Sequence, residues 1–293
     1  MILAARLVGA LLLAAIYVPT SAEMARAWWT HPYAGHGMFV PAFSAFVAWM
    51  DRRRLRAACS RGSWAGLPVI LLGLGVLALG RWAGSVALEG VSLVVTVAGL
   101  VLWSFGARCL KAAAFPVGFL LLMVPLPRPV VDAVTLDLQL FAVGFAGAAL
   151  DLLDVPFYLD GVLIRLPGIT LAVAEVCNGL RFLLALLVVT IAFAQVSQRT
   201  LPRKFIVGAS AIPIAILANA VRVAAVVLAV QYLGPQAASG FIHNSIAKGV
   251  WALTLIPLGV LGLVLRRRRD RRDPEPIAGT TQVNQGAAGR SQR

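Results

Sequence analysis

Long apolar runs dominate the chain and recur at nearly regular intervals. A helix needs about 20 apolar residues to cross the hydrocarbon core of a bilayer, and eight runs approach that length. The pattern therefore predicts an all-α polytopic membrane protein with about eight transmembrane helices. The expected spans cover residues 2–19, 34–50, 65–80, 85–107, 112–127, 177–196, 205–230 and 246–265.

Basic residues gather in alternate connections between these runs, and the other connections hold only scattered ones. Cytoplasmic connections of membrane proteins are enriched in Lys and Arg, so the pattern predicts that both termini are cytoplasmic. The sixteen residues that mark this face are Arg52, Arg53, Arg54, Arg56, Arg61, Arg108, Lys111, Arg199, Arg203, Lys204, Arg266, Arg267, Arg268, Arg269, Arg271 and Arg272.

Two segments between 129 and 173 depart from this alternation. The run 138–150 is apolar but has aspartates on both sides, so an interfacial or re-entrant helix is expected over 129–150 rather than a span. Residues 158–173 alternate between apolar and polar, with Pro167-Gly168 as a turn. That pattern predicts a short outer-face hairpin before the helix that carries Cys177.

The two ends of the chain carry different signals. Residues 1–22 also resemble a signal peptide, with one basic residue, an apolar run and small residues at the end. Cleavage there would remove one span and leave the orientation of the rest unchanged. The polar residues 273–293 are expected to form a disordered cytoplasmic tail, which leaves 1–272 as the integral membrane domain.

Composition sharpens this prediction by excluding other classes. Hydrophobic residues make up 60% of the chain and charged residues 13%, whereas soluble domains carry roughly 25% charged residues. A net charge of +14 would suggest nucleic acid in a soluble chain, but here it orients the helices, and no nucleic-acid partner is expected. Cys59, Cys109 and Cys177 form no CxxC pair, so the spacing supports neither a disulfide framework nor a zinc site. No metal or nucleotide motif occurs, and no cofactor is predicted.

Three reactive side chains are expected at one level of the membrane. Counted from the nearest cytoplasmic basic residue at 1.5 Å per residue, Cys177, Arg222 and His243 lie about 33, 27 and 34 Å away. Because the hydrocarbon core is about 30 Å thick, all three fall near its outer boundary. Three different spans thus bring a thiol, a guanidinium and an imidazole to the same face.

Each of these residues also has a purely structural interpretation. Cys177 could be a small packing residue, and His243, like His31 and His36, a solvated loop residue. Arg222 could extend its guanidinium to the outer headgroups. An arginine within an apolar helix nevertheless costs on the order of 2.5 to 3.5 kcal/mol. Asn219 lies one helical turn before it, so the two could form a polar pair inside the bundle.

The surroundings of Cys177 are more informative than the cysteine alone. A thiol at the start of a helix lies near the positive end of the helix dipole, and Gly179 would let another backbone approach closely. Arg181 follows Cys177 by one turn and Glu175 precedes it by two residues. A headgroup contact for Arg181 and a capping or solvated role for Glu175 remain open.

These residues form three motifs that resemble those of the exosortase/archaeosortase family. The resemblance includes their order, their place at outer span ends and the eight-span plan, over residues 1–265. His36-Gly37 and Leu138-Gln139 are also similar to family positions. The motifs are Glu175-Val-Cys177-Asn-Gly179-Leu-Arg181, then Asn219-Ala-Val-Arg222, then His243 in Phe-Ile-His-Asn ahead of Gly249 and Trp251.

The resemblance implies a membrane-embedded cysteine protease or transpeptidase of the cell inner membrane. Its partners would be membrane lipid and exported proteins that end in a sorting signal: a short motif, a transmembrane helix and a basic cluster. The active site would face the periplasmic or extracellular side. Cys177 would act as nucleophile through a thioester, His243 as acid and base, and Arg222 at the oxyanion. Glu175, Gly179, Arg181 and Asn219 would have supporting roles.

Two other functions fit the same residues. In a small transporter or lipid-handling carrier, Arg181 and Arg222 would bind an anionic substrate and Cys177 would only pack. A non-catalytic scaffold for envelope secretion is the third possibility. Both predict that Cys177→Ala retains activity, whereas the enzyme hypothesis predicts complete loss of substrate processing.

Overall fold

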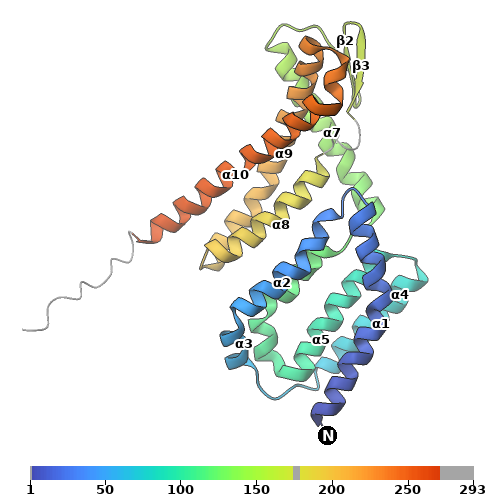
Figure 1. Cartoon of the computed structure of the whole chain (residues 1–293), viewed down its shortest axis with the longest axis vertical. Coiled ribbons are helices and arrows are strands. Elements are labelled where there is room, and N and C mark those ends of the chain that lie inside the picture. Colours follow the sequence, from blue (N-terminus) through green and yellow to red (C-terminus); the bar gives the residue numbers. More distant parts are fainter. Residues whose placement is uncertain (1, 174–178, 271–293) are drawn as a thin grey trace, which may run out of the picture.

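The computed structural model describes residues 2–173 and 179–270, and these fold into two helical halves (Figure 1). The first half consists of α1 (Ile2–Thr30), η1 (Gly35–Met38), α2 (Phe39–Met50), α3 (Arg52–Ala58), α4 (Gly66–Trp82), α5 (Val86–Ala112), α6 (Ala114–Phe119) and η2 (Leu120–Met123). The second half consists of α7 (Arg128–Asp151), β1 (Tyr158–Asp160), β2 (Leu163–Leu166), β3 (Ile169–Ala172), α8 (Leu180–Ser197), α9 (Leu201–Leu233), η4 (Pro235–Ala238) and α10 (Gly240–Asp270).

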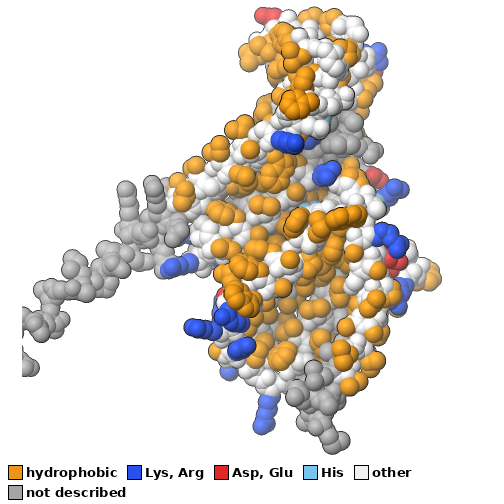
Figure 2. All heavy atoms as spheres, in the orientation of Figure 1, with side chains coloured by type: hydrophobic (Ala, Val, Ile, Leu, Met, Phe, Trp, Pro, Cys, Tyr) orange, Lys and Arg blue, Asp and Glu red, His pale blue; other side chains and the backbone are white. Residues whose placement is uncertain are grey.

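Five of the described helices are long and apolar enough to cross a membrane: α5, α7, α8, α9 and α10. Four of them coincide with predicted spans, and α4 and the α6–η2 segment are shorter apolar helices at two further predicted positions. Hydrophobic side chains are spread over the face seen in Figure 2, as expected of a surface in contact with lipid. The chain is a multi-pass membrane protein. The count of eight spans and the side of each terminus stay predictions.

The segment expected to be interfacial or re-entrant is a single continuous helix. α7 runs for 24 residues without a break and is long and apolar enough to cross a membrane, so its place at the interface stays a prediction. Its buried face packs against the sheet and the last turns of α9, through residues such as Ala146 and Leu150 of α7 and Val227 of α9. In Figure 1, α7 runs obliquely across the direction shared by α8, α9 and α10.

The predicted hairpin is present and is extended by a third strand. β1, β2 and β3 form an antiparallel sheet in chain order, in which Leu159 pairs with Ile164 and Ile164 with Leu171. Ile164 is fully buried, while Arg165 forms a 2.7 Å salt bridge with Asp160 on the exposed side. The alternation that predicted the hairpin thus separates a buried face from a solvated one.

The first helix is an integral part of the first half. Tyr17 Oη lies 2.8 Å from Thr96 Oγ1, and Thr20 Oγ1 donates to Glu89 Oε2 at 2.6 Å, so two side-chain hydrogen bonds join α1 to α5. Met24, one turn further, is buried in the apolar core of this half. Residues 17–24 therefore contribute to the packing of the bundle.

Two of the three cysteines pair, against the expectation from their spacing. Cys59 and Cys109 form a disulfide, with Cα atoms 4.5 Å apart and a sequence separation of 50. The backbone of α5 breaks at Gly106, where φ is +83°, and Ser60 N donates to Phe105 O at 3.0 Å beside this break. The pairing thus depends on a tertiary contact that no local spacing reveals.

Helix α8 connects the two halves. Val188, Ile191 and Ala192 pack against the core of the first half, whereas Leu186 packs with α9 and α10 through Ala215 and Leu258. The middle of α8 therefore lies between the two halves. The chain segment with Cys177 connects to the amino-terminal end of this helix, about two turns earlier.

Candidate functional site

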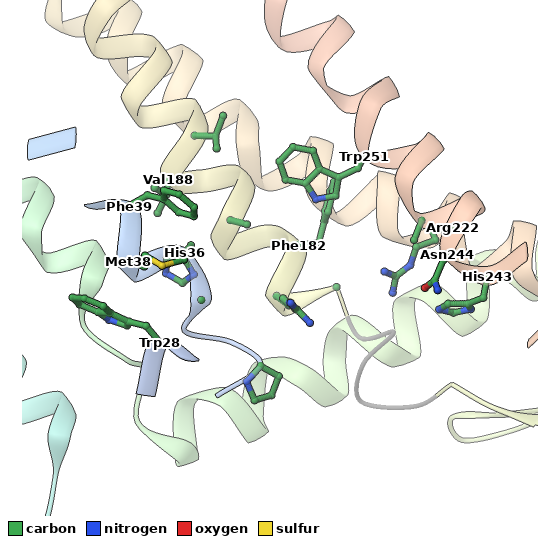
Figure 3. Close-up of a pocket in the computed structure, with 17 residues that line it drawn as sticks. Trp28, His36, Met38, Phe39, Phe182, Val188, Arg222, His243, Asn244 and Trp251 are labelled. Atoms are coloured by element: carbon green, nitrogen blue, oxygen red, sulfur yellow. The ribbon is translucent and has the colours of Figure 1, made fainter. Parts of the chain in front are cut away.

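A cavity of about 710 Å³ lies where α8, α9 and α10 meet η1. Four of the predicted site residues line it, together with one residue that the sequence had left aside, and they come from four different elements (Figure 3). The residues are Gly179 and Arg181 at the start of α8, Arg222 of α9, His243 of α10, and His36 of η1. The predicted convergence of a guanidinium and an imidazole is therefore present.

Arg222 and His243 form the polar end of this cavity, with Asn244 beside them (Figure 3). The positive charge of Arg222 is close enough to act on the imidazole of His243. Nδ1 of His243 is buried and has no hydrogen-bond partner within the described ranges. A ring nitrogen placed in this way can accept a proton from a group that enters the cavity.

Gly179 and Asn219 meet directly, although not through a backbone contact as the sequence suggested. Gly179 has φ +81° at the amino-terminal cap of α8, a conformation that favours glycine. A Cβ at this position would lie 2.7 Å from Cγ of Asn219, a buried side chain of α9. The contact fixes the start of α8 against α9 one helical turn from Arg222.

Arg181 lies in the first turn of α8 with an exposed side chain that lines the cavity. Cys177 and Glu175 lie outside the described residues, so the structure does not place them. On the other side of that segment, Gln139 Nε2 donates to the carbonyl of Val173 at 3.1 Å. The described chain is thus anchored on both sides of Cys177, by Gln139 before it and by Gly179 after it.

Apolar side chains form most of the remaining wall. Phe182 and Trp251 meet edge to face with ring centroids 5.8 Å apart, and Trp28, Phe39 and Val188 line the part nearer the first half. Such a wall lowers the local dielectric constant. Charges that develop in the cavity therefore interact more strongly than in water.

His36 is a residue whose position sequence reasoning missed. It was expected to be a solvated loop residue, but it is half-buried in the cavity wall, where η1 packs against η2. The resemblance of His36-Gly37 to a family position was the one signal that could have found it.

The polar groups of the cavity suit acyl transfer, in which a base and a cationic hydrogen-bond donor act on a carbonyl. Among residues 2–173 and 179–270, no cluster of three or more His, Cys, Asp or Glu could hold a metal ion.

Comparison with known proteins gives one match. The sequence model of the family described as transmembrane exosortase matches residues 28–261. This range includes every residue that lines the cavity and all the motifs around Cys177, Arg222 and His243. Comparisons with curated proteins and with solved structures found no match.

Proposed function

The chain belongs to the transmembrane exosortase family of membrane cysteine peptidases and transpeptidases, and we propose that it cleaves the carboxy-terminal sorting signal of exported proteins. The signal would comprise a short motif, a transmembrane helix and a basic cluster. The observation that carries this proposal is the cavity in which Arg222 and His243 converge beside Gly179. Gly179 follows Cys177 by two residues and so tethers the nucleophile to this cavity.

In the first step, the thiolate of Cys177 attacks the carbonyl carbon of the scissile peptide bond. His243 accepts the thiol proton and then donates it to the leaving amine as the C–N bond breaks. The buried Nδ1 of His243, which has no partner in the described part of the chain, supports this role. The product of the step is a thioester between Cys177 and the amino-terminal part of the substrate.

Arg222 would stabilise the oxyanion that forms during this attack. Its guanidinium offers several fixed N–H donors, and a donor of this kind is worth about 3 to 4 kcal/mol in a water-excluded site. Arg181 and Glu175 would support the charge balance around the thiolate, and Asn219 would hold Gly179 in place. The thioester would then be resolved by an amine, which gives transfer, or by water, which gives hydrolysis.

The lengths of the helices support an active site at the outer face of the inner membrane. α9 has 33 residues and is about 50 Å long, and Arg222 lies about 32 Å from its first residue, Leu201. His243 lies about 33 Å from Leu265, which precedes the basic cluster of α10. Both distances are close to the roughly 30 Å thickness of the hydrocarbon core. Lys and Arg also gather around α3 in Figure 2, consistent with a cytoplasmic end there.

The test of this function is co-expression of the chain with a tagged protein that ends in an apolar helix and a basic cluster. We expect Cys177→Ala to abolish cleavage at a normal protein level. The double variant Cys59→Ser, Cys109→Ser is the matched control, because these cysteines lie outside the cavity, and it should still cleave. Unchanged cleavage by Cys177→Ala would end the proposal and favour a carrier or scaffold.

The orientation has its own test, which uses single-cysteine variants in intact cells. A membrane-impermeant maleimide should label Cys177 from outside, whereas Cys59 and Cys109 should need a permeant reagent. Labelling of Cys177 from the cytoplasmic side alone would mean that the active site faces the cytoplasm, against this proposal.

We also propose residues 1–272 as one integral membrane unit, with 273–293 as a cytoplasmic tail. Packing of α1 on α5 and of α8 on the first half supports a single unit for the described part. The tail lies outside the described residues. Truncation after residue 272 should leave cleavage of the tagged substrate unchanged.

A further inference from the structure

The cavity has a polar end and an apolar end, and the proposed cleavage uses only the polar one. Figure 3 shows Arg222, Asn244 and His243 at one end and Phe39 and Val188 at the other. The lining of the apolar end indicates which part of a substrate this second region fits.

Helices α8 and α10 line the cavity with two matching rows of side chains, each spaced four residues apart. The rows are Arg181, Ala185 and Val189 on α8, and His243, Ala247 and Trp251 on α10. Residues four apart lie on one face of a helix, so each row follows one face for about 12 Å, or about two turns. Each row has a polar residue near the helix start, an alanine one turn further in and a larger apolar side chain after it.

The two rows belong to one continuous wall, because α8 and α10 contact each other along their length. The rings of Phe182 and Trp251 meet edge to face at 5.8 Å. Further along, a Cβ at Gly262 of α10 would lie 2.7 Å from Cε1 of Phe193 on α8. Phe39 of α2 lines the cavity from the first half and is 64% exposed. The apolar end is therefore bounded by both halves of the molecule.

The composition of this wall suits a transmembrane helix. Helices in membranes associate through small residues, which let their backbones approach closely, and both rows have an alanine at the middle position, Ala185 and Ala247. Val189 lines the cavity and is nevertheless 42% exposed, so the apolar end is open on one side. Helix α10 is also the least buried of the five candidate spans in the described chain, which leaves much of its surface for contact with another helix.

We propose that the apolar end of the cavity binds the first two turns of the substrate's transmembrane helix, packed against Ala185 and Ala247. This inference rests on the proposed function, because it concerns the helix of the sorting signal. That helix begins after the scissile bond and runs toward the basic cluster. α8 and α10 likewise run from their polar starts toward basic residues of this chain, so the three helices are parallel. The scissile carbonyl then lies at the polar end, beside Arg222 and His243.

The first test is photo-crosslinking in membranes, with the full-length chain, the tagged substrate and Cys177→Ala to prevent cleavage. Benzoylphenylalanine replaces either Val189 on the wall or Leu253, a residue of α10 that is 61% exposed and does not line the cavity. We expect a substrate adduct from position 189 and none above background from position 253. Peptide mapping should locate the adduct in the first two turns of the substrate helix.

The second test is kinetic and uses the chain with Cys177 intact. Ala247→Leu fills space that the substrate helix would occupy. It should raise KM about tenfold, within the range of an overpacked apolar contact, and lower kcat less than that. Ala252→Leu makes the same change at an exposed position of α10 outside the cavity, and it should keep the wild-type KM.

The proposal is overturned if position 189 captures only lipid, if positions 189 and 253 capture substrate equally, or if Ala247→Leu has the KM of Ala252→Leu. If Ala247→Leu does not fold, the crosslinking comparison decides alone. Failure of the proposed function gives a different result, since the chain with Cys177 would then leave the tagged substrate intact or Cys177→Ala would cleave it.

Discussion

Both halves of the molecule hold ionisable side chains within apolar helices, but they hold them in different ways. In the first half, Glu89 of α5 is buried and accepts a hydrogen bond from Thr20 of α1. In the second half, Arg222 and His243 line a cavity, and Nδ1 of His243 has no partner within the described chain. A hydrogen bond inside the bundle offsets part of the cost of burying a polar group, whereas a group at a cavity wall can bind a substrate.

The comparison shows that position along a helix does not tell a structural charged residue from one that can bind a substrate. Glu89 and Arg222 are each a single charged residue in a long apolar run. What differs is whether the side chain is enclosed between two helices, as Glu89 is, or lines a cavity, as Arg222 does. We therefore expect substitutions in the first half to change stability and substitutions at the cavity to change activity.

The largest effect is expected at the cavity. Arg222→Ala should lower the rate of cleavage about 10²- to 10³-fold, the usual effect of losing an oxyanion donor, at an unchanged amount of folded protein. Arg222→Lys should recover little of this loss, since an ammonium lacks the planar fork of donors. Cleavage of the tagged substrate, normalised to the protein level, measures both. Glu89→Gln is the control from the first half, and this variant should cleave normally per folded molecule. If Glu89→Gln loses cleavage, the contrast between a structural first half and a reactive cavity is wrong.

Arg222 and His243 should also behave as one unit. Residues that act on the same transition state are strongly non-additive, so Arg222→Ala combined with His243→Gln should cost little more than the more damaging single substitution. Rates for the wild type, the two single variants and the double variant measure this coupling. Independent, multiplicative losses would mean that the two side chains serve separate steps.

An intermediate effect is expected at Gly179, because this residue lines the cavity and also fixes the start of α8 against α9. Gly179→Ala places a side chain at φ +81° and a Cβ 2.7 Å from Asn219 Cγ. The backbone conformation alone costs an L-residue about 1 to 2 kcal/mol, and the contact moves the start of α8. Both thermal stability and cleavage should therefore fall.

The effect of the contact with Asn219 can be separated from the effect of the positive φ at Gly179. Asn219→Ala in the same chain removes the clash but leaves the backbone strain, so it should restore part of the stability lost in Gly179→Ala. Melting temperatures of the four combinations in detergent measure this. If Gly179→Ala lowers the melting temperature equally with Asn219 and with Ala at position 219, the close contact with Asn219 is not the source of the lost stability.

Counting along helices predicted that Arg222 and His243 lie near each other, because an α-helix has a constant rise. Arg222 and His243 lie in the continuous helices α9 and α10 and line one cavity, as their distances from the basic clusters suggested. The hairpin was also predictable, since alternation is a local property. His36 was not predictable from local pattern, because its burial depends on η2, more than 80 residues away. The same is true of the Cys59–Cys109 pair, which depends on the break at Gly106.

The smallest effect, at the hydrogen bond between Thr20 and Glu89, tests the comparison from the side of the first half. Thr20→Val keeps the shape of the side chain and removes the donor, so the buried carboxylate of Glu89 loses a partner at 2.6 Å. A buried hydrogen bond contributes about 1 kcal/mol, and in membrane proteins about 0.6 kcal/mol on average. Thr20→Val should therefore lower the melting temperature of the detergent-solubilised protein by a few degrees and leave cleavage per folded molecule unchanged. Thr20→Ser, which keeps the hydroxyl, should melt closer to the wild type. If Thr20→Val slows cleavage without lowering the melting temperature, then Glu89 acts in the reaction, and the division between a structural and a reactive half is wrong.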